Sequence, residues 1–233
     1  MLHQIRYTDS GIIAHLYTRE FGRHAFLIKG MRNKKTGRHN VFFQPLSILE
    51  IVFYHKGSGG VKLLKEFSVS FSPADIYSDI KKSCVAVFLG EVLASVLKEE
   101  SPNEKLYSYI ENSIIYFEGC KTAYANFHIA FLAGLSSFLG FEPGKRDDSR
   151  NVYFDMLNGT FVPVPPLHGF YENERLSDIL AAFFTTSFDT MKNIPLSGTV
   201  RNQVLETFIR YYSLHLPGLK EIKSLEVLKE IFR

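Results

Sequence analysis

Apolar and polar residues follow two different patterns along this chain, and the pattern changes at Ser72. Before Ser72 the apolar runs are short, partly alternating, and rich in β-branched and aromatic residues, which predicts β-strands. The expected strands are Ile12–Thr18, Arg23–Gly30, Leu46–Lys56 and Val61–Phe71. The segment Lys56–Gly60 predicts a hairpin loop, because glycine adopts positive φ without strain. A phosphate-binding loop would need a following lysine, a serine or threonine, and a helix, whereas here a strand follows.

From Ser72 onward the apolar residues recur with helical spacing. Ser72–Asp75 predicts a helix start, with Ser72 as N-cap and Pro73 in the first turn. The first helix should bury an apolar stripe made of Ile76, Ile80, Cys84, Val87 and Phe88. The expected helices are Ala74–Lys98, Asn103–Glu118, Thr122–Leu139, Arg175–Thr190, Thr199–Leu214 and Leu225–Phe232.

The segment Gly140–Phe170 is rich in glycine and proline, and it holds two short strand patterns, Val152–Met156 and Thr160–Val164. Four to five short strands in about 70 residues fit an OB-fold, a small, partly open five-stranded barrel. The expected fold class is therefore α+β, with an N-terminal five-stranded OB-fold β-barrel followed by an all-helical C-terminal domain. We expect the barrel domain at 1–72 and the helical domain at 73–233, with a loop and short-strand insertion at about 140–170.

Positive charge is concentrated in the first third of the chain. Residues 1–70 hold 11 basic and 4 acidic side chains, a net charge of +7, whereas the rest of the chain has 16 and 20, a net charge of −4. A basic surface attracts polyanions because their condensed counterions are released on binding. Nucleic acid is therefore the first hypothesis for the ligand, and an anionic membrane surface is a distant second.

The predicted DNA-binding residues are the seven basic side chains between Arg19 and Arg38. They are Arg19, Arg23, Lys29, Arg32, Lys34, Lys35 and Arg38. Only Glu20 opposes them in that window, and phosphates are the ligands such a cluster would bind. Bases stack on aromatic side chains in OB-folds, and Tyr7, Tyr17 and Phe26 are candidates. The alternative for each aromatic residue is burial in the barrel core.

The remaining composition excludes several classes of protein. Cys84 and Cys120 cannot by themselves form a disulfide framework or a zinc site, and such sparse cysteine use suits a reducing compartment. No signal-peptide core is recognisable at the N-terminus, and no apolar run reaches the roughly 18 residues of a membrane span. The expected location is the cytoplasm.

We predict no catalytic residues, no metal site and no cofactor. Cys84 should be a buried structural thiol, because no basic residue is placed to lower its pKa. Asp147 and Asp148 lie among basic residues in a polar loop, which indicates a solvated turn. Five histidines lie in the N-terminal part without metal-ligand spacing: His3, His15, His24, His39 and His55.

Several motifs taken together resemble the RecO family of bacterial recombination mediators, in particular its Bacteroidetes-type members. They are Tyr7–Ser10, Tyr17–Arg23, Lys29–Lys35, Gln44–Ser47 with Leu49 and Glu50, His215–Pro217 and the C-terminal Lys223–Glu226. The resemblance covers nearly the whole chain. It implies the same fold, an OB-fold followed by a helical domain, and a non-enzymatic activity.

The resemblance also implies partners. Members of this family bind single-stranded and double-stranded DNA, anneal complementary strands, and help load RecA onto DNA covered by SSB, together with RecR. They contact the acidic C-terminal tail of SSB. In the helical domain, the cations available for such a tail are Lys121, Arg201, Arg210, Lys220 and Lys223, and the alternative for each is plain solvation.

Two departures from the family pattern carry expectations. The chain starts later than is usual for the family, so either its first strand is short or the true start lies upstream of Met1. A truncated first strand would leave a barrel edge unpaired. Some members bind zinc through four cysteines in the helical domain, but Gly140–Phe170 contains no cysteine, and His168 alone cannot hold zinc. We therefore expect no structural zinc.

Three other functions remain open from the residues alone. An RNA-binding OB-fold module would use the same electrostatics and stacking. A scaffolding protein could use the basic face to bind an acidic peptide. A hydrolase is the weakest alternative, because no catalytic motif is visible, although active sites also assemble from distant residues.

Overall fold

The computed structural model describes residues 1–8, 11–29, 42–54, 60–98 and 101–233 of the chain. These residues form two compact units. The first comprises Met1–Gly119 and Ile222–Leu225, and the second comprises Cys120–Glu221 and Glu226–Arg233. A domain boundary after residue 72 stays a prediction. Most of the loop expected at Lys56–Gly60 lies outside the described residues.

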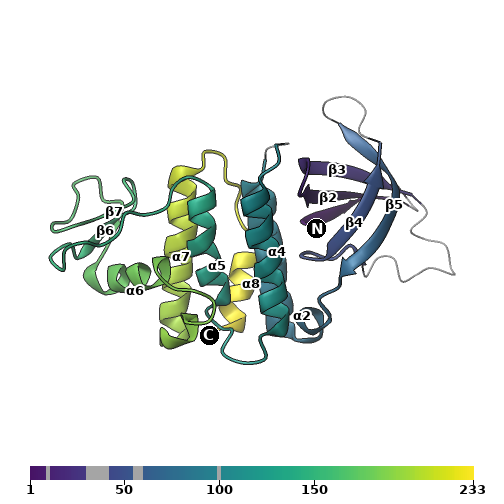
Figure 1. Cartoon of the computed structure of the whole chain (residues 1–233). Helices are drawn as coiled ribbons and strands as arrows, with labels where there is room; N and C mark the ends of the chain where they lie inside the picture. Colours follow the sequence, from purple (N-terminus) through teal and green to yellow (C-terminus); the bar gives the residue numbers. More distant parts are fainter. Residues whose placement is uncertain (9–10, 30–41, 55–59, 99–100) are drawn as a thin grey trace. The chain divides into compact units, whose positions relative to one another are not determined.

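The first unit begins with a five-stranded sheet (Figure 1). Its strands are β1 (His3–Arg6), β2 (Ile12–Thr18), β3 (Gly22–Ile28), β4 (Ile48–Phe53) and β5 (Val61–Phe71). The strand order is β1-β2-β3-β5-β4, with β3 and β5 parallel and the other neighbours antiparallel. This arrangement confirms the OB-fold expected from the sequence. β2 and β5 have the predicted bounds.

Alternation along β2 and β3 places every second side chain in the barrel core. Ile12, Ala14 and Leu16 face inward from β2, and Phe26 and Ile28 face inward from β3. Phe26 has no exposed surface, and its ring contacts that of Phe53 edge to face at a centroid distance of 4.9 Å. The period-two pattern read from the sequence is therefore the pattern of strands with one face in the core.

Three helices complete most of the first unit: α2 (Ala74–Ser78), α3 (Ile80–Val96) and α4 (Glu104–Gly119). The prediction of one continuous helix over Ala74–Lys98 is wrong at Asp79. Asp79 has extended backbone, and its carboxylate accepts hydrogen bonds from the backbone N–H groups of Lys81 and Lys82. Aspartate prefers this N-cap role to a helix interior, because its side chain competes for backbone donors.

The predicted N-cap at Ser72 is also wrong, because Pro73 occupies the N-cap position of α2. The carboxylate of Glu118 replaces it, accepting from the backbone N–H groups of Asp75 and Ile76 at 2.8 Å each. Close by, the buried Lys82 Nζ donates to the carbonyl oxygens of Phe117 and Glu118 at 2.9 and 3.1 Å. Glu118 and Lys82 thus bind backbone N–H and C=O groups at helix ends, which have no partner within their own helix.

The apolar stripe predicted for the first helix is only partly buried. Ile76 and Phe88 are buried, but Ile80 and Val87 are 71% and 46% exposed, and Cys84 is half-buried rather than buried. Val85, Leu89, Val92 and Leu93 complete the buried face instead. α3 carries apolar residues on most of its sides, so their spacing could not select the buried one.

The second unit is mainly helical, as predicted, with shifted ends. Its helices are α5 (Phe127–Phe138), α6 (Glu174–Phe184), η1 (Met191–Asn193), α7 (Gly198–His215) and α8 (Ser224–Ile231), whose first two residues belong to the first unit. None of the helices in the described ranges is both long enough and apolar enough to cross a membrane.

A small antiparallel sheet in the second unit has the order β7-β6-β8. β6 (Tyr153–Asp155) and β7 (Thr160–Val162) confirm the two predicted strand patterns, whereas β8 (Tyr171–Glu172) was not predicted. The buried carboxylate of Asp155 accepts from the backbone N–H groups of Leu157 and Asn158 and lies 3.2 Å from Nε2 of His168. Burial opposes ionisation of Asp155, but these hydrogen bonds hold its pKa below the ordinary value.

Candidate nucleic-acid interface

One aliphatic row crosses the outer face of the barrel. The strand register places Ile5 opposite Ile13, Ile13 opposite Leu27, and Leu27 opposite Leu63. Ile13, Leu27 and Leu63 alternate with residues of their strands that are buried or pack on the core, so they face away from it, and Ile5 pairs with Ile13 on that side. Ile5 and Leu63 are each 51% exposed. The row is therefore an apolar surface across β1, β2, β3 and β5 that faces outward.

Three more exposed side chains lie just beyond this row. Tyr7 and Lys29 follow the ends of β1 and β3, and Lys65 lies where the pairing of β4 with β5 shifts register. All three are exposed, Tyr7 by 60%. Tyr54, at the end of β4, is 63% exposed, and the Nζ of Lys65 lies 6.0 Å from its ring centroid. We call Tyr7, Lys29, Tyr54 and Lys65 the outer-face cluster.

The outer-face cluster combines the two kinds of group that bind single-stranded nucleic acid. Exposed rings offer stacking platforms for bases, and lysines attract the phosphates between them. Tyr7 follows β1 and Tyr54 follows β4, so the two rings lie at the β1–β2 and β4–β5 loops, which bind oligonucleotides in OB-folds. The salt bridge between Lys65 and Glu66, at 3.6 Å, is solvent-exposed and weak enough to yield to a phosphate.

The structure separates the three aromatic stacking candidates. Tyr7 is exposed, as stacking requires, whereas Phe26 is fully buried in the core. Tyr17 is half-buried, and its ring lies 6.3 Å from that of Tyr107. The sequence reasoning missed Tyr54 and Lys65. Tyr54 could have been found from its position in the sequence, because an aromatic residue just before a predicted hairpin loop lies at the end of a strand.

Arg19 has partners within the first unit. Its Nη2 donates to Oε2 of Glu111 at 2.7 Å, and its Nη1 lies 4.0 Å from Glu104. The guanidinium also stacks over the ring of Tyr107, 4.7 Å from its centroid. These contacts neutralise much of its charge, so its assignment to DNA stays a prediction without support from its surroundings.

Arg23 binds the end of a helix. Its Nη1 donates to the carbonyl oxygens of Ala94 and Leu97, at 2.6 and 2.7 Å, where α3 ends. These carbonyls lack helical partners, and the helix dipole favours a cation there. Burial lowers the pKa of the guanidinium below its ordinary value, although it stays charged at neutral pH. Its DNA role also stays a prediction.

Only one of the other predicted DNA-binding residues lies in the part of the chain that the structure describes. Lys29 is exposed and belongs to the outer-face cluster. Four more lie outside the described residues, namely Arg32, Lys34, Lys35 and Arg38. For these four the assignment rests on the sequence alone and stays a prediction.

Two of the five cations suggested for an acidic peptide are used inside the second unit. Arg201 donates to Oδ1 of Asn126 and to the carbonyl oxygen of Leu196, at 3.0 and 2.9 Å. Arg210 donates to the buried carboxylate of Glu172 at 3.3 Å. Lys220 is exposed.

The residues predicted to take no part in catalysis or metal binding are placed as follows. Within it, no cluster of three or more histidine, cysteine, aspartate or glutamate side chains could hold a metal ion. Asp148 forms an exposed ion pair with Arg150 at 2.6 Å, as in a solvated turn. Cys84 and Cys120 are both half-buried free thiols.

Comparison with known proteins gives a consistent result. Residues 1–72 match the family model "Recombination protein O N terminal", and residues 77–226 match "Recombination protein O C terminal". The chain is 37% identical over 232 residues to "DNA repair protein RecO" of Phocaeicola vulgatus, covering 100% of this chain and 96% of that protein. It is 38% identical over 234 residues to the protein of that name in Bacteroides fragilis, with the same coverage. The protein of that name from Flavobacterium psychrophilum is 30% identical over 233 residues, again with 100% and 96% coverage.

Proposed function

Because the chain belongs to the RecO family of DNA repair proteins, we propose that it is a recombination mediator that binds and anneals single-stranded DNA. In this proposal its ligands include double-stranded DNA, and it helps load RecA onto SSB-coated strands together with RecR. The protein acts in the cytoplasm, where bacterial chromosomal DNA lies, and it uses no cofactor.

The single observation that carries the DNA-binding part is the outer-face cluster. Tyr7 and Tyr54 expose their rings after β1 and β4, Lys65 lies beside the ring of Tyr54, and Lys29 is exposed after β3. In OB-folds the β1–β2 and β4–β5 loops bind oligonucleotides. Ring stacking and lysine charges do not distinguish one base from another. Binding should therefore be independent of base sequence and strongly dependent on salt.

Annealing needs no chemical step in this proposal. Two strands repel each other because each carries a phosphate charge per nucleotide, and lysine and arginine side chains reduce that repulsion. The predicted cations of the segment 30–41 would add to Lys29 and Lys65 in this role. Once the strands approach, base pairing drives the product, so the protein only has to hold the backbones and leave the base edges accessible.

The partner assignments rest on the family and on the charges of the helical part. Proteins that bind an acidic tail need cations beside apolar surface. The exposed Lys220 is a candidate contact for the SSB tail, since Arg201 and Arg210 already have intramolecular partners. We make no assignment of individual residues to RecR.

The proposal predicts that the protein accelerates annealing of complementary oligonucleotides, one carrying a fluorophore and the other a quencher, in the absence of ATP. The acceleration should fall steeply with salt, since four phosphate contacts to single strands weaken binding roughly 50-fold between about 50 and 200 mM. An annealing rate equal to the protein-free rate at low salt would contradict the proposal. Non-complementary strands are the control, and they should show no quenching.

A further inference from the structure

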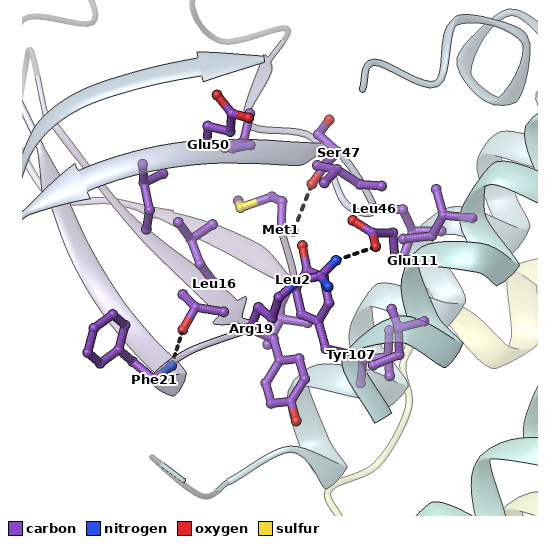
Figure 2. A pocket seen from close by; sticks show the side chains of 18 of the residues that line it. Met1, Leu2, Leu16, Arg19, Phe21, Leu46, Ser47, Glu50, Tyr107 and Glu111 are labelled. Atoms are coloured by element: carbon purple, nitrogen blue, oxygen red, sulfur yellow. Dashed lines mark hydrogen bonds and ion pairs between the residues drawn. The ribbon is translucent and has the colours of Figure 1, made fainter. Parts of the chain in front are cut away.

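The aliphatic row on the outer side of the barrel faces away from the core. Its members Ile5, Ile13, Leu27 and Leu63 pair from strand to strand across β1, β2, β3 and β5. At the usual spacing of strands the row spans about 14 Å. The opposite side of β2 lies in the core, where Leu16 lines a cavity of about 280 Å³ (Figure 2). A continuous apolar surface that faces outward indicates an interaction site.

The row is continuous with the loop that carries Tyr7. At the β1–β2 loop the backbone N–H of Tyr7 donates to the carbonyl oxygen of Gly11 at 3.1 Å. A Cβ atom placed on Gly11 would lie 3.9 Å from Cδ1 of Leu27, so the Leu27 side chain lies against this loop. Lys29 follows Leu27 by two residues, at the end of β3. The row therefore adjoins Tyr7 and Lys29 of the outer-face cluster.

The charged residues next to the row in the sequence are all basic. Segments 3–7, 11–15, 25–29 and 61–65 contain the row, and they hold Arg6, Lys29, Lys62 and Lys65 but no aspartate or glutamate. Arg6, Lys29 and Lys65 are exposed. Such a surface fits a ligand with apolar groups and negative charge, and a single DNA strand has both because its bases are unpaired. An anionic lipid surface has both too, but membership of a family of DNA repair proteins favours DNA.

We propose that the aliphatic row binds the C5-methyl group of thymine, so that the protein prefers single strands that contain thymine; this inference rests on the proposed function. Thymine is the one standard DNA base that carries a methyl group, and apolar side chains contact this group in DNA recognition. The methyl group takes no part in pairing with adenine, so a thymine held by it can still pair, as annealing requires. The preference adds to the sequence-independent binding by the outer-face cluster.

The test compares single strands that differ only in this methyl group. Short homopolymers of thymidine and of deoxyuridine, equal in length and each carrying a fluorophore, are titrated with the full chain, and fluorescence anisotropy gives both dissociation constants. One methyl group buried on the row should tighten binding about fourfold, the equivalent of about 0.8 kcal/mol. Homopolymers of 5-methyldeoxycytidine and deoxycytidine form a second pair, which should show the same ratio.

Two double variants assign the preference to the row. Ile5→Thr with Leu63→Thr replaces the two most exposed members of the row by a polar residue that suits strands, and it should bring the ratio of the two dissociation constants close to one. Ile80→Thr with Val87→Thr is the matched control, because both are exposed aliphatic side chains of α3 in the same unit. The control should keep the fourfold ratio. Circular dichroism confirms that all three proteins are folded.

Equal and tight binding of the thymidine and deoxyuridine strands by the wild type would overturn the role of the row and leave the proposed function standing. Absence of binding to every single strand at low salt would overturn both. A fourfold ratio that persists in the variant of Ile5 and Leu63 would show that another surface contacts the methyl group. Vesicles of phosphatidylglycerol that bind the wild type but not this variant, without any thymidine preference, would assign the row to a lipid surface.

Discussion

Replacing Phe26 with alanine should destabilise the barrel by about 3–5 kcal/mol, the usual cost of removing a fully buried phenylalanine. Phe26 is completely buried between β-strand neighbours, and its ring contacts those of Phe53 and His24 edge to face. The deletion leaves a cavity that the close-packed barrel cannot fill by small shifts. Urea unfolding followed by circular dichroism should show the barrel transition at a lower urea concentration.

The Phe26 variant also decides between core and stacking roles for this ring. Phe26→Leu keeps most of the volume and should keep both stability and DNA binding. Leu27→Ala removes a half-buried side chain from the outer face and should cost far less stability than Phe26→Ala. A Phe26→Ala protein that unfolds like the wild type but has lost DNA affinity would show that the ring stacks on bases after all.

Removing both exposed rings of the outer-face cluster should weaken single-stranded DNA binding by at least about 30-fold, from about 1 kcal/mol or more for each stacked base. Tyr7 and Tyr54 are 60% and 63% exposed, so Tyr7→Ala with Tyr54→Ala should leave the barrel folded. Fluorescence anisotropy of a labelled oligonucleotide at fixed salt measures the effect.

Two controls make the result specific to stacking. Duplex DNA hides its base faces, so the same double variant should lose much less affinity for a duplex than for a single strand. Leu167→Ala removes a fully exposed apolar side chain of the second unit and should leave both affinities unchanged. An equal loss for single strands and duplex would mean that the tyrosines support phosphate contacts and do not stack.

The barrel could be predicted from the sequence because its local patterns and its tertiary contacts agree. Alternating residues in β2 face the core and the outer side in turn, so the period was visible without the structure. Phe26 shows the limit of the same pattern. It is aromatic and lies in a basic region, so it suited both core and stacking roles, and only the phase of the strand, which the structure provides, separates them.

The residues at which helices begin could not be predicted, because side chains distant in the sequence cap them. Glu118 supplies the N-terminal acceptor for α2 over a separation of 43 residues, a pairing that no local motif encodes. Asp79 divides the expected first helix by capping α3, although helical spacing continues through it. The candidate interface could likewise be predicted only in part from the sequence. Lys29 was found by its charge, but Lys65 lies near it only through the pairing of β3 with β5, and Tyr54 meets Lys65 only through the pairing of β4 with β5.

The central claim is that the basic side chains between residues 30 and 41 hold the phosphates of single-stranded DNA. The most direct test titrates a fluorescent oligonucleotide across salt, with a variant in which Arg32, Lys34, Lys35 and Arg38 are alanine. A control variant removes four exposed cations of the second unit instead: Lys145, Arg175, Lys192 and Lys220. The slope of log K against log salt should become shallower by about 3 in the first variant, from roughly 0.7 per phosphate, and stay unchanged in the control. Identical slopes for the wild type and the first variant would contradict the account.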